Sequence, residues 1–334
     1  MAMTLAEMKV GMSDKVASQV VDIFLRESEI LQLLPFDNCV SPQGGSTLTY
    51  AYVQKKLPSV AAFRALNNEY TANQATVEKK TADLKIFGGS FEIDRVLNQA
   101  EGLFNNMEYQ IREKVLGAIS LFHHTLINGN SSTTATEFDG LDKMLTGTSS
   151  EFGTSAAIDV STMANLKTNA DALYEAIQLL IKNTNADALL MNAAMIAKVQ
   201  TMARILGYKT DSEEAFGKKV VSMDGVRFMD LGNHYTTTTS GGTTTAVANA
   251  CVKAGITRTI GQTSTTGLTD IYAVKFDVND GFHAATLTGN GAIHHYLPDF
   301  NQPGAVKKGE VEMVAAAVLK NTAHAGVLRN IKIA

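Results

Sequence analysis

Two pairs of adjacent histidines are the residues in this sequence best suited to metal chemistry, because imidazole nitrogens are common metal ligands. They are His123 with His124 and His294 with His295. Neighbouring residues on a helix point about 100° apart, so they do not share one ion as residues four positions apart do. No HExxH pattern and no acidic partner three residues further on accompanies them. We interpret these histidines as structural and predict neither a metal site nor a cofactor.

Glycine pairs could form loops that bind phosphate. They occur at Gly88-Gly89, Gly241-Gly242 and Gly289-Asn290-Gly291. None continues as GK[ST] into a helix, and none belongs to a GxGxxG that follows a strand. No serine lies in a GxSxG hydrolase elbow. Turn formation therefore accounts for these glycines.

The two cysteines, Cys39 and Cys251, are far apart and form no CxxC pair. We interpret them as small buried apolar residues in a protein made in a reducing compartment, because neither has a histidine nearby in sequence. With no catalytic constellation, the chain is predicted not to be an enzyme. An enzyme with an α/β catalytic domain at residues 159–229 is kept as an alternative that ranks below two non-enzymatic hypotheses.

The composition is that of a globular protein. Of 334 residues, 45% are apolar and 19% are charged, which favours a substantial core over disorder. A net charge of −4 argues against a dedicated nucleic-acid binder, which needs clustered Lys and Arg. The sequence lacks a secretory-signal pattern and an apolar run of about 20 residues. We therefore expect a soluble protein that is cytoplasmic when made.

The first third of the chain predicts a helix followed by a long β-ribbon. Apolar spacing indicates an amphipathic helix at residues 13–34, stopped by Pro35. Strands are expected at 46–53, with Leu48, Tyr50 and Tyr52 on one side, and at 76–94. The polar stretch between them has little to bury, so we expect a hairpin reaching about 35–40 Å from the body. An isolated ribbon is marginal in water and favours a partner surface.

The remaining chain predicts a rod helix followed by an α/β part. One apolar stripe indicates a helix opening at Asp94 and running to about residue 127, and Asn128-Gly129-Asn130 end it. Residues 131–161 are expected to be a linker. Helices at 165–183 and 193–206 flank a strand at 188–191, and a hairpin follows at 220–229. Residues 235–269 are left unassigned, and strands are expected at 271–276, 283–288, 292–297, 310–319 and 327–333.

This order of parts resembles the major capsid proteins of tailed bacteriophages, which share the Hong Kong 97-like fold. Short stretches sharpen the resemblance: Leu34-Pro35-Phe36, AAFRALNNEY at 61–70, Ile93-Asp94-Arg95, Ile127-Asn128-Gly129 and Phe138-Asp139-Gly140-Leu141. The resemblance covers nearly the whole chain and is strongest from Leu31 to Leu145.

The resemblance implies an α+β fold with four parts. These are an N-terminal arm at 1–40, an extended loop at 41–92, a peripheral domain at 93–150 and 270–318 with a spine helix at 95–127, and an α/β axial domain at 151–269 and 319–334. Some relatives carry a scaffolding segment before the arm. This sequence shows none, which implies a separate scaffold protein or unassisted assembly.

The resemblance also implies a function. The chain would be a structural subunit that self-assembles into hexamers and pentamers of an icosahedral virion capsid, put together in the host cytoplasm. Its expected partners are itself, a portal, a separate scaffold and double-stranded DNA contacted without sequence specificity. The charged ribbon residues, taken with the motif, predict inter-subunit contacts at Lys55, Lys56, Arg64, Glu69 and Tyr70. The alternatives are the shell of an encapsulating bacterial nanocompartment and a phage tail tube protein.

Overall fold

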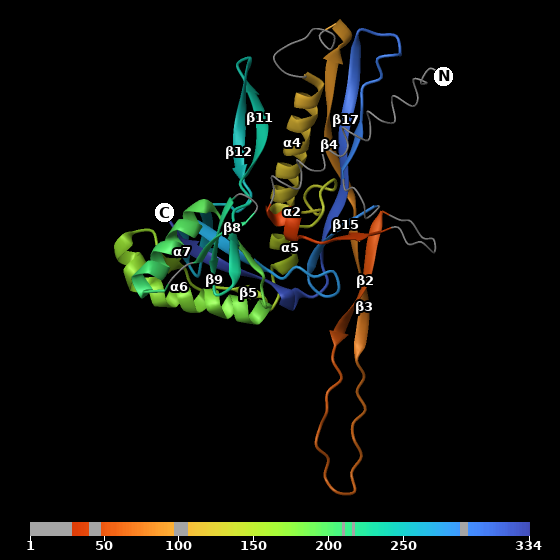
Figure 1. The fold of residues 1–334 in the computed structure, drawn as a ribbon. Helices are drawn as coiled ribbons and strands as arrows, with labels where there is room; N and C mark the ends of the chain where they lie inside the picture. Colours follow the sequence, from red (N-terminus) through yellow and green to blue (C-terminus); the bar gives the residue numbers. More distant parts are fainter. Residues whose placement is uncertain (1–28, 40–47, 97–105, 209–210, 216–217, 288–292) are drawn as a thin grey trace.

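The computed structural model describes residues 29–39, 48–96, 106–208, 211–215, 218–287 and 293–334. Within these ranges the strands form two larger sheets and two separate ribbons. Figure 1 shows an upright part built around one long helix, an α/β part beside its lower end, and a ribbon projecting downward. No described helix combines the length and apolar character needed to cross a membrane.

The first sheet carries the long helix. Its strands are β1 (Phe36–Asn38), β15 (Phe282–Thr286), β17 (Val306–Leu319) and β16 (Ile293–Tyr296) in that order, with β4 (Lys85–Asp94) also paired to β17. Ten residue pairs join β4 to β17, so these two strands form one long antiparallel ribbon. Helix α4 (Asn106–Asn128) lies along it (Figure 1).

The apolar stripe of α4 faces this sheet. Val115, Phe122 and Leu126 are fully buried. Phe122 stacks on Phe87 of β4, with ring centroids 6.0 Å apart, and on Phe36 of β1 at 6.4 Å. Because the helix seals one face of a sheet built from distant segments, the stripe predicted from the sequence is the centre of the first core.

The central strands of the second sheet are buried on both faces. Its strands run in the order β5 (Glu151–Phe152), β18 (Ala325–Lys332), β14 (Thr263–Val274), β7 (Ala188–Leu190), β10 (Val226–Met229), β9 (Lys218–Met223) and β8 (Asp211–Ala215). In addition, β13 (Ile256–Ile260) pairs with β14 and β6 (Ile158–Asp159) pairs with β18. On β7, Ala188 and Leu190 join the first core while Leu189 joins a second core under the helices. This explains why β7 is apolar throughout.

Two helices cover the outer face of the second sheet. The side chain of Thr162 accepts from the backbone N–H of Asn165 to cap α6 (Met163–Thr184), and Asn192 accepts from Met195 to cap α7 (Ala193–Leu206). The structure also has the short helices α2 (Glu29–Leu33) and α5 (Leu141–Leu145) and a 3-10 turn, η1 (Thr322–His324).

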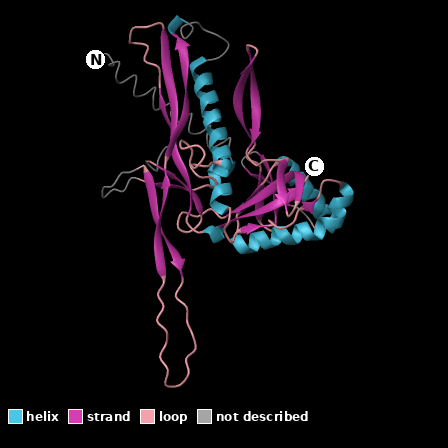
Figure 2. Cartoon of the chain, turned by 180° about the vertical axis from the view of Figure 1, so that it is seen from behind, coloured by secondary structure: helices cyan, strands magenta, loops and turns pink. Residues whose placement is uncertain are grey.

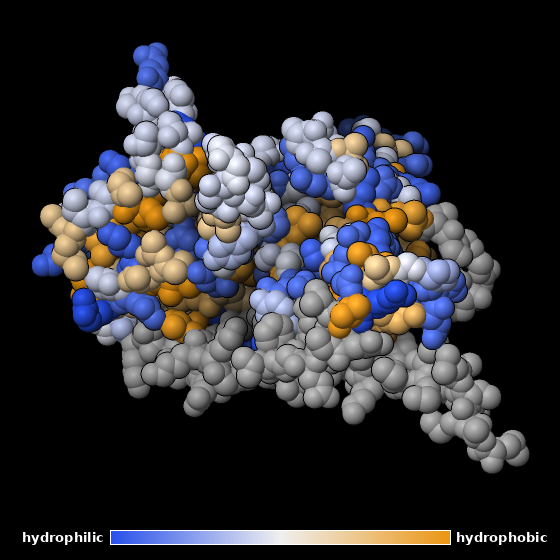
Figure 3. Space-filling view, turned by 90° about the horizontal axis from the view of Figure 1, so that it is seen from above, coloured by the Kyte–Doolittle hydropathy of each residue, from blue (hydrophilic) through white to orange (hydrophobic). Residues whose placement is uncertain are grey.

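Two ribbons leave the body in opposite directions. The hairpin of β2 (Thr49–Leu57) and β3 (Thr76–Asp83) points away from α4, whereas the hairpin of β11 (Asn233–Ser240) and β12 (Thr243–Ala250) runs beside it (Figures 1 and 2). Seen from above, hydrophobic and hydrophilic residues are interspersed on the body (Figure 3).

The predicted helices are confirmed where the structure describes them. Helix α4 covers the predicted spine from Asn106 and ends at Asn128, and residues 97–105 lie outside the described ranges. The helical conformation begins at Arg95, as predicted for the spine, and directly follows β4, which ends at Asp94. Of the terminal helix at 13–34, the described part is Glu29–Leu33, before Pro35.

The long strand predicted at 76–94 is two strands. Leu84 interrupts it, is buried, and donates its backbone N–H to the carbonyl of Leu48 at 2.7 Å. β3 then pairs with β2, while β4 pairs with β17, so the run belongs to two different sheets. The strand expected at 46–53 is Thr49–Leu57 within the described residues. The unassigned residues 235–269 form most of β11, β12, β13 and the start of β14.

Candidate functional site

The β2–β3 ribbon and the loop that continues it are the candidate site. The ladder pairs Thr49 with Asp83 at one end and Leu57 with Thr76 at the other. Residues 58–75 extend beyond it without regular pairing, and all of them are exposed. Both ribbon views show this segment reaching away from the body (Figures 1 and 2). We call residues 58–75 the ribbon tip.

The ribbon tip is held by local contacts. The side-chain amide of Asn73 accepts from the N–H of Val60 at 2.8 Å and donates to its carbonyl at 2.7 Å. The guanidinium of Arg64 donates to the carbonyl of Asn68 at 3.1 Å and lies 5.5 Å from the ring centroid of Tyr70. Asn67 adopts φ of 68°, the left-handed region that asparagine tolerates. These contacts link the two sides of the tip to each other.

Large apolar side chains of the ribbon lie uncovered. Phe63 is 107% exposed and Leu66 is 88% exposed, relative to an extended reference. The other exposed members are Val53, Leu57, Val60, Tyr70 and Val77. Scattered apolar residues are normal on a surface, but a concentration on one projecting segment is typical of an interaction site.

The charged residues predicted as contacts are arranged in two ways. Lys56 lies 3.9 Å from Glu78 across the ribbon, and Glu78 also pairs with Lys80 at 2.7 Å. Arg64 and Tyr70 form the cation–π pair of the tip. Lys55 and Glu69 are exposed, and neither makes a described side-chain contact with the other predicted residues.

Two tyrosines and one glutamine of β2 fix the ribbon base to the first sheet. The hydroxyl of Tyr52 donates to the carbonyl of Leu319 at 3.0 Å, and the amide of Gln54 donates to the carbonyl of Lys320 at 2.9 Å. The hydroxyl of Tyr50 donates to the carboxylate of Asp37 on β1 at 2.5 Å. Tyr50 and Tyr52 thus lie on one side of β2, as their alternation predicted, and the structure turns that side toward the body.

The electrostatics of the base keep Tyr50 neutral. Burial and the adjoining Asp37 carboxylate both raise the pKa of the Tyr50 hydroxyl. Burial by itself would raise the pKa of Asp37, but hydrogen bonds from Tyr50 and the amide of Asn38, together with Lys320, hold it below its usual value. The Lys320 ammonium lies 5.3 Å from the Tyr50 ring centroid. A neutral donor therefore meets a charged acceptor at this contact.

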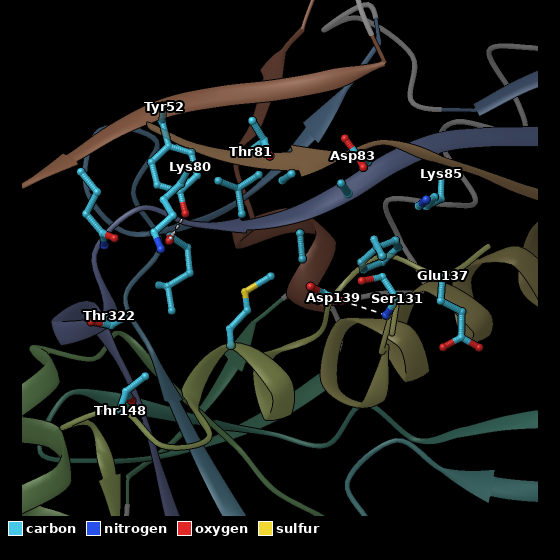
Figure 4. Close-up of a pocket in the computed structure, with 18 residues that line it drawn as sticks. Tyr52, Lys80, Thr81, Asp83, Lys85, Ser131, Glu137, Asp139, Thr148 and Thr322 are labelled. Atoms are coloured by element: carbon cyan, nitrogen blue, oxygen red, sulfur yellow. Dashed lines mark hydrogen bonds between the residues drawn. The ribbon is translucent and has the colours of Figure 1, made fainter. Parts of the chain in front are cut away.

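A cavity of about 500 Å³ lies between the ribbon base and the body (Figure 4). Its lining mixes Lys80 and Lys85 with the carboxylates of Asp83, Glu137 and Asp139. Lys85 donates to the carbonyl of Ala135 at 2.9 Å, and Asp139 pairs with Lys143 at 2.8 Å. These charges position the ribbon and the loop after α4. We therefore interpret the cavity as a gap between packed structural elements and not as a ligand site.

The motifs considered for chemistry are separated in the fold. His123 and His124 lie on α4, and His294 and His295 lie on β16. Among the described residues, no group of three His, Cys, Asp or Glu could hold a metal ion. Burial raises the pKa of the Cys251 thiol to about 12 and raises that of Cys39 as well. Both thiols are therefore poor nucleophiles at neutral pH.

The anchoring residues of the base were not found from the sequence. Asp37, His283 and Lys320 come from three separate segments that meet Tyr50. The available signal was the pair of tyrosines on one side of β2, which indicated a covered face without identifying what covers it.

Comparisons with known proteins rest on structure. No family model matches the chain, and no curated protein matches its sequence. The fold is similar to that of the holo-SrpI encapsulin complex of Synechococcus elongatus, with a TM-score of 0.58, 11% identity, and 91% of this chain and 87% of that chain covered.

Two further similar structures are, by their descriptions, a particle capsid and a phage. The capsid of a native GTA particle gives a TM-score of 0.56 at 12% identity, with 90% of this chain and 89% of that chain covered. Mycobacterium phage Ogopogo gives 0.54 at 12% identity, with 90% and 91% covered. The expected α+β, Hong Kong 97-like fold is confirmed by these similarities over nearly the full length.

Proposed function

We propose that this chain is the major capsid protein of a tailed bacteriophage, a non-enzymatic subunit that assembles with copies of itself. The single observation that carries the proposal is the projecting ribbon, whose large apolar side chains, above all Phe63 and Leu66, are not covered by any of the residues that the structure describes. The fold is shared with the GTA capsid and the phage structure, which agrees with this role.

The ribbon supplies the contacts in this proposal. An extended element that lies across a neighbour can bury the roughly 2,000 Å² or more typical of obligate assemblies. Phe63 and Leu66 provide apolar area, while Lys55, Lys56, Arg64, Glu69 and Tyr70 provide polar contacts around it. Exposed ion pairs contribute about 0–1 kcal/mol each, so apolar burial dominates the stabilisation.

The four-part division also belongs to the proposal. We assign residues 1–40 to the arm, 41–92 to the extended loop, 93–150 and 270–318 to the peripheral domain, and 151–269 and 319–334 to the axial domain. Strand β14 extends to Val274 within the second sheet and thereby links the last two parts. Hexamers and pentamers would close into an icosahedral shell around double-stranded DNA in the virion, assembled in the host cytoplasm with a portal and a separate scaffold.

Removal of the ribbon tip tests the proposal. Residues 58–75 are replaced by Asn-Gly, which closes Leu57 onto Thr76 with a two-residue hairpin turn. The contacts of Tyr50, Tyr52 and Gln54 with the body remain, so the monomer should keep its melting temperature. We expect the wild type to form shells by electron microscopy and the shortened chain to remain small. Unchanged shells from the shortened chain would overturn the role of the ribbon tip in assembly, and a wild type that forms no shells would overturn the capsid assignment.

A double substitution gives a milder version of the same test. Phe63→Ser with Leu66→Ser should raise the concentration needed for assembly at least tenfold, with the unfolding free energy changed by less than about 0.5 kcal/mol. Leu179→Ser on α6 is the matched control, because Leu179 is also exposed, at 54%, but lies away from the ribbon. Equal effects of the two changes would argue against a specific role for the tip.

The shell of a nanocompartment is the second candidate, favoured by the similarity to the encapsulin complex. The contents of purified shells distinguish the two. Nuclease-protected double-stranded DNA supports the capsid, and a stoichiometric cargo protein supports the nanocompartment. A tail tube protein is a third alternative, and stacked rings or tubes in place of closed shells would favour it.

A further inference from the structure

His283 lies at the point where the ribbon meets the first sheet. It belongs to β15 and is fully buried. Its imidazole packs edge-on against the ring of Tyr50, with centroids 5.6 Å apart and planes 72° apart. Tyr50 is in turn the β2 residue that bonds Asp37. A titratable ring therefore supports the side chain that fixes the direction of the ribbon.

The two nitrogens of His283 have unequal surroundings. Nδ1 lies 3.5 Å from the carbonyl of Gly281, whereas the buried Nε2 has no hydrogen-bond partner. A neutral ring with its hydrogen on Nδ1 fits this arrangement. A second proton on Nε2 would create a buried charged donor with no acceptor, which proteins avoid by moving one of the groups.

Charged groups from several segments of the chain surround His283 and act on its pKa. Burial first, and then the Lys320 ammonium, lower the pKa of His283, while the Gly281 carbonyl and the carboxylates of Asp37 and Asp277 act in the opposite direction. Tyr50 stays neutral, and Cys39, whose pKa is raised, is also close to the tyrosine. Asp37 thus interacts with both His283 and Tyr50, and the Tyr50 hydroxyl is hydrogen-bonded to it.

We propose that His283, Tyr50 and Asp37 form an acid-sensitive latch that sets the direction of the ribbon. When the imidazole is neutral, Tyr50 packs on it and donates to Asp37. A proton from solvent bound at Nε2 makes His283 compete with the Tyr50 hydroxyl for Asp37, because Asp37 is, of the two carboxylates that favour the imidazolium, the one that accepts from Tyr50. Tyr50 then leaves, and the ribbon is freed to turn relative to the first sheet. The consequence for assembly rests on the proposed function.

The remaining contacts at the base act as a pivot. The bonds from Tyr52 and Gln54 go to backbone carbonyls at the end of β17, and neither donor titrates near neutral pH. They hold the ribbon to the body while the Tyr50 contact opens. The latch therefore changes the direction of the ribbon without detaching it.

Hydrogen exchange measured by mass spectrometry tests the latch on the full chain. The readout is the protection of peptides covering Thr49–Leu57 and Thr76–Asp83 at pH 7.5 and 5.0, corrected for intrinsic exchange and compared at equal assembly state. In the wild type we expect protection to fall at least tenfold at pH 5.0. His283→Phe keeps a ring against Tyr50 but cannot titrate, so its protection should change less than threefold.

Two further variants complete the experiment. His294→Phe is the matched control, since His294 is an exposed histidine of the same sheet, and it should behave as the wild type. Tyr50→Phe removes the hydroxyl bound to Asp37 and leaves His283 intact. Its ribbon should already exchange at pH 7.5 as fast as the wild type at pH 5.0, which tests the latch even if His283→Phe fails to fold.

The latch is overturned if wild-type protection is the same at both pH values, or if His283→Phe loses protection as the wild type does. It is also overturned if Tyr50→Phe remains protected at pH 7.5. These results are separate from the proposed function, whose test is shell formation at pH 7.5. A chain that never forms shells but shows the predicted exchange would retain the latch and lose the capsid assignment.

Discussion

The guanidinium of Arg329 lies 3.0 Å from the carboxylate of Asp270, and both side chains are almost fully buried. Arg329 also bonds Glu151 at 2.9 Å and contacts Asp142, so it joins α5 and β5 to β14 and β18. Arg258 pairs with the same Asp270 at 2.5 Å. This cluster therefore ties α5, which packs in the first core, to the second sheet.

Arg329→Met should be strongly destabilising. The change leaves the carboxylate of Asp270 buried with one cation in place of two, and removing one partner of a buried ion pair costs about 3–5 kcal/mol. Urea unfolding monitored by circular dichroism measures the loss. Lys332→Met is the control, because its 3.6 Å pair with Asp159 is partly exposed and should contribute less than about 1 kcal/mol. Similar losses in the two variants would contradict the role of Arg329.

Local sequence signals predicted the regular elements well. Helix α7 was predicted with both bounds correct, since Asn192 caps it and Gly207 ends it with φ of 77°. The split at Leu84 was missed because both halves read as one strand, and sequence alternation does not reveal a change of partner. The Thr-rich hairpin β11–β12 was missed for a related reason. Its strands are exposed on both faces, so no apolar alternation marks them.

The candidate site was predictable in outline only. A charged, weakly apolar segment between two strands was enough to predict a projecting ribbon, and the contact residues on it remain a prediction. The base was not predictable, because Tyr50 meets His283 and Lys320 across more than two hundred residues of chain, as the 267-residue separation of Tyr52 and Leu319 illustrates. Such pairings depend on the sheet order, which the sequence does not state.

Charge reversal at Lys55 and Lys56 should weaken assembly in a salt-dependent way. Lys55→Glu with Lys56→Glu removes the pair with Glu78 and places like charges near it, on the exposed ribbon. Because screening grows with ionic strength, we expect a larger loss of assembly at 50 mM than at 500 mM salt, measured by light scattering.

The control for this pair carries the same change of charge elsewhere. Lys167→Glu with Lys182→Glu alters two exposed lysines of α6. If it reproduces the salt dependence, net charge and not the ribbon is responsible.

Acid should destabilise the contact between His124 of α4 and His234 of β11, whose rings lie 5.7 Å apart. Burial lowers the pKa of both, and His234 and Lys253 lower that of His124 further. Since the unfolded chain then binds more protons, stability is complete above about pH 6.5 and falls as the pH drops through the folded values.

His234→Gln should reduce this loss between pH 7 and pH 5 by about 0.5–1 kcal/mol, a modest figure because His234 is partly exposed. Urea unfolding at the two pH values measures it. His283 contributes in the same direction, so some pH dependence remains. His294→Gln should leave the loss unchanged, and a loss unaffected by His234→Gln would exclude the pair as its source.

Gly88 and Gly89 provide a test of close packing on adjacent residues. A Cβ at Gly88 would lie 1.9 Å from the carbonyl oxygen of Val311 on β17, whereas one at Gly89 would lie 3.1 Å from Cδ of the flexible Lys114 side chain. Backbone cannot yield as a lysine can, so Gly88→Ala should destabilise the chain by about 2–4 kcal/mol and Gly89→Ala by less than about 1 kcal/mol. Thermal unfolding compares them. Equal melting temperatures would mean that β4 and β17 separate more easily than their ten-residue ladder indicates.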